Sequence, residues 1–312
     1  MNHANYSHNR SKTCGRGVFI GKAQSSRSIG CRIVRFRLAA VVVVFLAALL
    51  PAAKAQEPVI PQLWDAQERL SKPDLSALPR LRFLTTTDFP PFNFLDGQGR
   101  LSGFHVDLAR AICARLELAD KCQIQAVPWD ELQGALELGE GEAIIAGLAA
   151  TAETRAAYAF SRPYLQFPAR FAVQKSRAPS EPVQDSLRGR PVGVVAGSAH
   201  ERMLRDYFGA VTVVPLPDED ALQAELKAGR IDAAFGDGMR LSFWLADAAS
   251  EKCCRFAGGP LIAPEYLGTG LAIATRAGDA LLPAALDYAL QDIAAKGTFA
   301  ELYLRYFPVG FY

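Results

Sequence analysis

Short apolar segments alternate with amphipathic segments along most of the chain, and this alternation restricts the fold more than any other feature. From Leu81 onward, strands are expected at 81–85, 122–127, 143–148, 191–195, 212–216 and 231–235. Helices are expected between and after them, at 106–116, 129–138, 201–208, 218–228, 281–295 and 299–306. Strands that alternate with helices at this spacing pair in parallel, because each helix returns the chain across the sheet. The pattern therefore predicts an α/β fold with mostly parallel sheets.

Two stretches share one organisation. Residues 129–147 and residues 218–237 each predict a helix, a glycine-containing turn and a buried strand. One such unit in each half of the chain indicates two lobes of similar architecture, and it does not indicate a short-period repeat array.

Residues 1–55 differ from the rest in charge. They contain nine basic residues and no Asp or Glu, and an uncharged apolar run occupies 38–50. A helix of that length spans about 20 Å, too little for a hydrocarbon core of about 30 Å. Ala53 and Ala55 are small residues at the positions that signal peptidase recognises. We expect residues 1–55 to be a secretory signal peptide cleaved after Ala55, the alternative being an uncleaved anchor or a buried helix.

The mature chain then carries 25 basic and 32 acidic residues, a formal charge of −7. An acidic protein whose basic run belongs to its leader is not expected to bind nucleic acid. Residues 56–79 are polar and rich in proline, with at most one short helix at 63–70, and they form an N-terminal extension.

Four cysteines remain after cleavage, namely Cys113, Cys122, Cys253 and Cys254. Export to an oxidising compartment favours disulfides, and four cysteines allow three pairings. A bond between the adjacent Cys253 and Cys254 would be strained, so free thiols or an intermolecular bond stay open for that pair. With two histidines and no CxxC spacing in the mature chain, we expect no metal and no cofactor.

Eight motifs occur in an order and at a spacing that are specific together. They are FPPF (89–92), GFHVDLARAI (103–112), PWDEL (128–132), AIIAGLAATAETR (143–155), FSRPY (160–164), VGVVAGSAHE (192–201), GRIDAAFGD (229–237) and GTGLAIATRAGD (268–279). With them the chain resembles the bacterial extracellular solute-binding proteins of family 3, which serve amino-acid ABC importers. The resemblance covers residues 81–307.

The resemblance implies a two-lobed, type II periplasmic binding protein fold. Two hinge strands, expected near 171–174 and 267–273, would join lobes that close on a solute. Lobe 1 is expected at 80–172 plus 270–312, and lobe 2 at 173–269. The resemblance also implies a Cys113–Cys122 disulfide, because a bond from either of them to Cys253 or Cys254 would tie the lobes together.

The same resemblance places candidate ligand-binding residues. Asp237 matches the residue that accepts an α-ammonium group, and it follows a buried strand at the edge where open sheets bind ligands; its alternative role is a helix N-cap. Phe89 matches the aromatic that covers the ligand side chain, and Trp129 a residue of the opposite wall. Core packing is the alternative for both.

The expected carboxylate partner departs from the family pattern of Thr, two residues, then Arg. Here Thr151 is followed by three residues before Arg155, so Arg155 either reaches the ligand through a differently opened turn or is a solvated helix residue. Backbone N–H groups at Gly147, Ala149 and Ser198 are further candidates. His200 either contacts the ligand or caps its helix. His105 is expected on the surface, at a helix start.

We therefore expect a monomeric periplasmic binding protein, and not an enzyme, that delivers a small polar solute, an amino acid or another amine, to an ABC permease. No GxSxG, HExxH, Walker or GxGxxG motif supports a hydrolase, a zinc protease or a nucleotide-dependent enzyme. The alternatives are a dehydratase of the cyclohexadienyl or prephenate type on the same fold, and a binding protein accessory to a periplasmic dehydrogenase or sensor.

Overall fold

The computed structural model describes residues 60, 63–65 and 67–312. The predicted signal peptide, its cleavage site at Ala55 and residues 56–59, 61, 62 and 66 of the extension lie outside these residues. Within them, two five-stranded sheets and one three-stranded sheet form.

The first sheet has the order β5-β1-β6-β13-β7. Its strands are β1 (Leu81–Thr85), β5 (Cys122–Ala126), β6 (Ala143–Ile144), β7 (Tyr158–Phe160) and β13 (Ala274–Arg276). Strands β5, β1 and β6 pair in parallel, whereas β13 is antiparallel to both of its neighbours.

The second sheet has the order β10-β9-β11-β8-β12. Its strands are β8 (Ala169–Gln174), β9 (Pro191–Val195), β10 (Thr212–Leu216), β11 (Ala233–Asp237) and β12 (Cys254–Leu261). Strands β10, β9 and β11 are parallel, and β8 is antiparallel to β11 and β12. Each sheet is thus mixed, and the predicted parallel pairing describes three strands of each.

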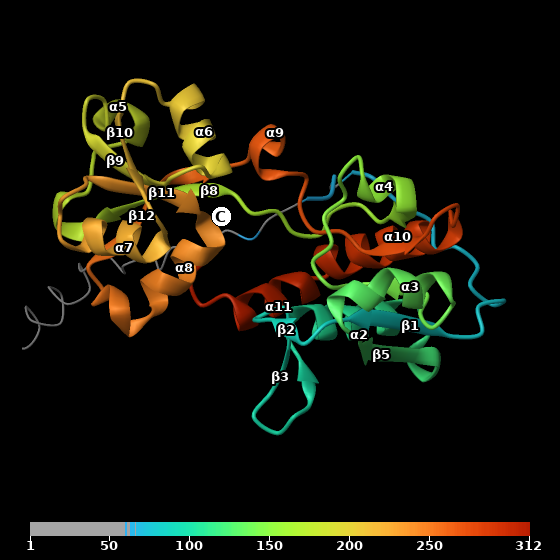
Figure 1. The fold of residues 1–312 in the computed structure, drawn as a ribbon. Coiled ribbons are helices and arrows are strands. Elements are labelled where there is room, and N and C mark those ends of the chain that lie inside the picture. Colours follow the sequence, from blue (N-terminus) through green and yellow to red (C-terminus); the bar gives the residue numbers. More distant parts are fainter. Residues whose placement is uncertain (1–59, 61–62, 66) are drawn as a thin grey trace, which may run out of the picture. The chain divides into compact units, whose positions relative to one another are not determined.

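Alternate residues of each sheet face different helices, so both faces of both sheets are buried. In the first sheet, Phe83 and Ile145 pack with α2 (Phe104–Arg115), α10 (Leu281–Ala295) and α11 (Thr298–Tyr306), whereas Leu84 and Ile144 pack with α3 (Leu132–Glu137). Figure 1 shows the red helices α10 and α11 beside α2.

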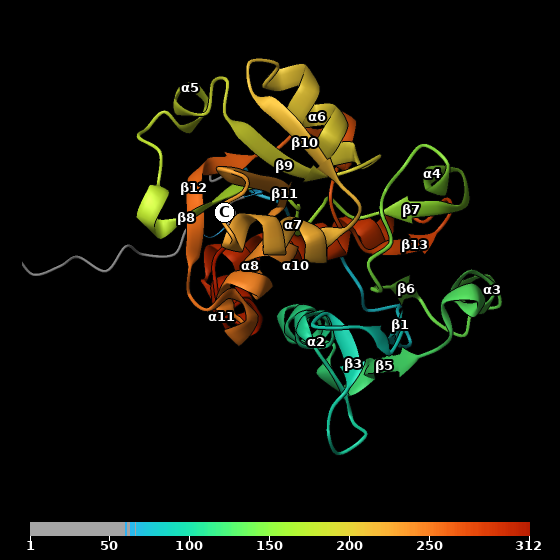
Figure 2. The same cartoon turned by 60° about the vertical axis from the view of Figure 1, so that its left-hand side comes forward.

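The second sheet is covered in the same way. One face packs on α5 (Val183–Ser186), α6 (Ala199–Tyr207) and α9 (Pro264–Leu267), and the other on α7 (Glu219–Lys227) and α8 (Gly238–Ala246). Figure 2 shows α6 on one side of β9 and β11 and α7 and α8 on the other. The remaining helical segments are α4 (Thr154–Ala157) and 3₁₀ turns at Ala119–Lys121, Trp129–Glu131, Lys175–Arg177 and Ala248–Ser250.

The two repeated units occupy equivalent places. The strand of the first unit, β6, and that of the second, β11, each lie third in their sheet, between the parallel and the antiparallel strands. The similarity of organisation in the sequence therefore corresponds to a similarity of topology.

The chain passes from the first sheet to the second through residues 161–168 and returns through residues 262–273. We call these the two connecting segments. The boundary predicted at 172/173 falls inside β8, and that at 269/270 falls within the second segment. The division into lobes stays a prediction.

The four cysteines of the described residues form two disulfides. Cys113 and Cys122 form the disulfide that the resemblance implies, with a Cα–Cα distance of 6.1 Å. Cys253 is bonded to Cys254, which settles the alternatives that were open for this pair.

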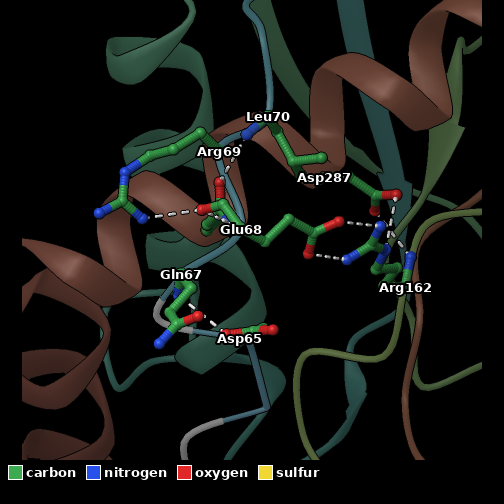
Figure 3. Close-up of polar contacts among 8 residues, drawn as sticks. Asp65, Gln67, Glu68, Arg69, Leu70, Arg162 and Asp287 are labelled. Carbon is green, nitrogen blue, oxygen red and sulfur yellow. Dashed lines mark hydrogen bonds and ion pairs between the residues drawn. The ribbon is translucent and has the colours of Figure 1, made fainter.

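Polar contacts anchor the N-terminal extension on α10 and on the first connecting segment. The Arg162 guanidinium lies between the carboxylates of Glu68 and Asp287, and its Nη2 donates to Glu68 Oε1 at 2.7 Å (Figure 3). The Leu70 N–H donates to Gln291 Oε1 at 3.1 Å. The described residues of 63–70 are not helical, so the short helix allowed there is not formed.

A small sheet of β2 (Asp88–Phe89), β3 (Asn93–Leu95) and β4 (Leu101–Ser102) precedes α2. Gly103, the residue before α2, lets the helix start pack closely against the loop at 89–92. Gly103 has φ 129°, and a Cβ at this position would lie 2.2 Å from the carbonyl oxygen of Phe92. The N–H groups of Phe104 and His105 donate to the carbonyls of Pro91 and Phe92 at 3.0 and 2.8 Å. The loop at 89–92 is therefore fastened to the first turn of α2.

Replacing Gly103 by Ala is expected to destabilise the protein by ~2 kcal/mol or more, because the backbone has no room for a Cβ and the φ angle disfavours L-residues. Gly97 is the matched control, since a Cβ there meets nothing within 4 Å. Urea unfolding of both variants measures the effect. Equal stability of the two variants would contradict the proposed packing.

Candidate functional site

The carboxyl ends of β9 and β11 carry predicted site residues at the starts of two helices. Ser198 caps α6 by accepting from the Glu201 N–H at 3.1 Å, and its hydroxyl donates to Val195 O at 2.7 Å. Asp237 ends β11 and caps α8, with Oδ1 accepting from the Arg240 N–H at 2.9 Å. The N-cap alternative for Asp237 is thus realised through one oxygen, and a cap does not prevent ligand contact.

A pocket of about 100 Å³ opens at this edge of the second sheet. Its apolar floor comes from Val195, Leu222, Phe235 and Leu241. Its polar lining consists of Ser198, His200, Glu219, Gln223, Asp237 and Arg240. Three predicted residues, Ser198, His200 and Asp237, are therefore brought together.

His200 lines this pocket and does not cap its helix, because Ser198 does so. Its ring lies edge-on to Phe235, with centroids 6.2 Å apart. Burial lowers the pKa of His200, and the Asp237 and Glu219 carboxylates oppose that shift. His200 is therefore a largely neutral polar group beside two carboxylates.

Sequence reasoning missed Glu219, Gln223 and Arg240. Glu219 and Arg240 lie in the first turns of α7 and α8, and the Arg240 guanidinium is 3.3 Å from the Glu219 carboxylate. Their position in the sequence could have identified them as candidate site residues, because both closely follow the carboxyl end of a predicted strand, as Asp237 does.

Phe89, in β2 of the small sheet, and Gly147, just beyond β6, are brought together. Phe89 stacks on Phe92, with centroids 4.7 Å apart and planes 21° apart. Gly147 has φ 90°, and a Cβ there would lie 2.7 Å from the Phe89 ring. Because Gly147 has no side chain, the Phe89 ring, which is predicted to cover the solute, can pack directly against the backbone at this position.

The remaining predicted site residues are Ala149, Arg155 and Trp129. Ala149 is exposed and pairs with Leu271, and its carbonyl accepts from Thr154 Oγ1 at 2.7 Å. Arg155 is exposed, with its guanidinium carbon 5.6 Å from the centre of the Phe160 ring. Trp129 is 52% exposed. The structure does not place Arg155 or Trp129 in the pocket of the second sheet.

The expectation that His105 lies on the surface is wrong. His105 is fully buried, since the loop fastened to the first turn of α2 covers it. Its Nδ1 lies 2.7 Å from Asn93 Oδ1, and its Nε2 lies 2.8 Å from the Tyr164 hydroxyl. Burial lowers the pKa of His105 to about 3 and raises the pKa of Tyr164.

Within the described part of the chain, no group of His, Cys, Asp and Glu side chains suits a metal ion. Over the same residues, no helix has the length and apolar character needed to cross a membrane.

The contribution of His105 to stability is expected to fall as the pH drops below about 6.5, because His105 takes up a proton there in the unfolded chain, whereas the buried side chain of the folded protein is protonated only near pH 3. Each pH unit corresponds to about 1.4 kcal/mol. Unfolding free energies of wild type and His105→Gln between pH 7 and 4.5 measure the effect, and the value for wild type should fall relative to that for the variant as the pH drops. Asp287, whose pKa burial raises to about 6, acts in the opposite sense in both proteins. Parallel curves would contradict the assignment.

Known proteins resemble the chain over most of its length. Residues 81–309 match the model of the bacterial extracellular solute-binding proteins, family 3. The chain is 32% identical over 240 residues to the lysine/arginine/ornithine-binding periplasmic protein of Escherichia coli K12, covering 76% of this chain and 91% of that protein. It is 31% identical over 241 residues to the histidine-binding periplasmic protein of the same strain, again covering 76% and 91%.

Among solved structures, the L-cystine solute receptor of Neisseria gonorrhoeae in its unliganded open conformation superimposes with a TM-score of 0.63 at 19% identity, covering 74% of this chain and 94% of that one. This likeness establishes the type II periplasmic binding protein fold. The family match covers most of the chain and contains both sheets. The chain belongs to family 3 of the bacterial extracellular solute-binding proteins.

Proposed function

We propose that the protein captures an L-amino acid in the periplasm and delivers it to the permease of an ABC importer. The observation that carries the proposal is the position of Asp237, at the carboxyl end of β11 and on the edge of a polar-lined pocket. Its free carboxylate oxygen is suited to an α-ammonium group, since charge-assisted hydrogen bonds are the strong ones.

The solute is proposed to lie between two lobes that correspond to the two sheets. The second lobe supplies Ser198, His200 and Asp237. The first supplies Phe89 over Gly147, with Trp129 and the backbone at Ala149 as further contacts. The connecting segments at 161–168 and 262–273 would be the hinges.

A basic amino acid is proposed as the first ligand to test. The pocket edge holds two carboxylates, Glu219 and Asp237, against one guanidinium, Arg240, beside a His200 whose pKa is lowered. A ligand with one net positive charge would balance this excess. The names of the two E. coli relatives state that they bind basic amino acids or histidine.

We also propose that the protein is a monomer, that its signal peptide is removed near Ala55, and that it does not catalyse a reaction. The relatives are binding proteins, which supports the last point. A dehydratase would convert a prephenate-type substrate, whereas a binding protein shows only saturable stabilisation.

Asp237→Asn is expected to weaken ligand binding at least ~10-fold, because it keeps the helix cap and removes the charge that meets the ammonium group. Asp218→Asn is the matched control, since Asp218 caps α7 by accepting from the Ala221 N–H at 2.8 Å and does not line the pocket. Calorimetry and melting shifts of residues 56–312 with L-arginine, L-lysine, L-ornithine, L-histidine, putrescine and prephenate make the measurement.

Wild-type binding in Asp237→Asn would exclude the assigned role of this carboxylate. Turnover of prephenate without a saturable melting shift would replace the binding function by the dehydratase. A wild-type protein that binds none of the amino acids would refute the proposed ligand class.

The carboxylate partner is tested by comparing Arg155→Gln with Arg240→Gln. We expect Arg155→Gln to weaken amino-acid binding at least ~10-fold and to leave putrescine binding, if present, nearly unchanged, because putrescine has no carboxylate. Arg240, already paired with Glu219, is expected to matter less. The reverse ranking in calorimetric affinities would reassign the carboxylate to Arg240.

A further inference from the structure

A chain of buried polar side chains crosses the core of the first sheet. It consists of Thr86, Asn93, His105 and Tyr164, each at most 2% exposed. Asn93 Nδ2 donates to Thr86 Oγ1 at 2.6 Å, and His105 bonds to Asn93 on one side and to Tyr164 on the other. Because buried polar groups are costly unless they are paired, this arrangement holds each side chain in one orientation. We call it the His105 network.

The partners determine which ring nitrogen carries the proton. Asn93 uses its amide nitrogen toward Thr86, so its Oδ1 faces His105 Nδ1 and can only accept. Nδ1 is therefore protonated, and Nε2 of the neutral ring accepts from the Tyr164 hydroxyl.

Within the network, His105 contacts the loop that carries Phe89. The His105 ring lies 4.8 Å from that of Phe92 and 6.2 Å from that of Phe89, between centroids. The His105 N–H also holds the Phe92 carbonyl. A shift of the His105 ring would therefore move the aromatic pair that covers Gly147.

The Tyr164 end of the network lies where the connecting segments pair. The Tyr164 N–H donates to the Leu271 carbonyl at 2.9 Å, and the Leu271 N–H donates to the Leu165 carbonyl at 2.7 Å. Three residues earlier, the Ser161 N–H donates to Ile273 O at 2.9 Å. The hydrogen bond of the Tyr164 hydroxyl therefore links His105 to the place where the two connecting segments pair.

We propose that His105 is a positioning residue for the solute site. In its Nδ1-protonated form it ties the Phe89 loop to Tyr164, so that the aromatic cover and the connecting segments keep one relative arrangement. The inference rests on the proposed function, since it takes Phe89 as a ligand contact. It adds a residue that does not itself contact the solute.

The test uses two substitutions that remove the same hydrogen bond from opposite sides. Tyr164→Phe removes the hydroxyl. His105→Asn retains a donor toward Asn93 and loses the acceptor for Tyr164. His105→Gln is the conservative variant, because its amide oxygen can reach the place of Nε2. Tyr303→Phe is the matched control, since Tyr303 is buried in the same core and its hydroxyl accepts from the Phe311 N–H at 3.1 Å.

L-Arginine affinity is measured by calorimetry, and stability by urea unfolding. We expect Tyr164→Phe and His105→Asn to weaken binding at least ~10-fold, His105→Gln to recover part of the loss, and Tyr303→Phe to change binding less than ~2-fold. The double variant Tyr164→Phe/His105→Asn should bind no worse than the weaker single variant, because both act through one bond. Near wild-type binding in Tyr164→Phe and His105→Asn, or losses that follow stability equally in all variants, would overturn the inference.

A ligand-free measurement separates this inference from the proposed function. Hydrogen exchange at the amides of Phe92 and His105 should accelerate at least ~10-fold in Tyr164→Phe and stay unchanged in Tyr303→Phe. Unchanged exchange in Tyr164→Phe overturns the inference even if wild type binds L-arginine. If exchange is faster in Tyr164→Phe but the wild-type protein binds no amino acid, the positioning role is supported and the proposed ligand is refuted.

Discussion

The pairing of the two connecting segments is the constraint on which the rest of the structure depends. Leu271 lies between Ala149 and Leu165, so three stretches far apart in the chain meet at one strand-like junction. Backbone hydrogen bonds at Tyr164 and Ser161 close it. The chain enters and leaves the second sheet here, and the antiparallel strands β8 and β13 directly follow the two connecting segments.

Helix starts at strand ends form the candidate site. In the second sheet the carboxyl ends of β9 and β11 lead into capped helices, and Ser198 and Asp237 each have one oxygen engaged by a cap. This leaves a rigid edge with a charge pattern that is set before any ligand arrives, which is how preorganised sites reduce the entropy lost on binding. We infer a similar role for the His105 network beneath Phe89, where His105 bonds to both Asn93 and Tyr164.

The periodic parts of the fold were predictable and the connecting parts were not. Strands 81–85, 191–195 and 212–216 and helix 281–295 form as expected, because their apolar spacing matches a single face or a buried strand. Residues 171–174, expected to form a hinge strand, belong to β8 of the second sheet. Strand β12 was missed, because it pairs antiparallel with β8 and lies outside the alternation of strands and helices from which the other strands were predicted. The expected strand at 143–148 is assigned only over Ala143–Ile144, and Gly147 beyond it has a left-handed φ.

The sequence by itself determined the α/β class, the family, the small disulfide and the position of Asp237, because local periodicity and motif order carry that information. Only the tertiary structure decided that His105 is buried and that Glu219 and Arg240 line the same pocket as Asp237. These facts depend on contacts between residues distant in sequence. Whether a polar side chain faces water, a core partner or a pocket is set by what packs on it, and no local pattern encodes that.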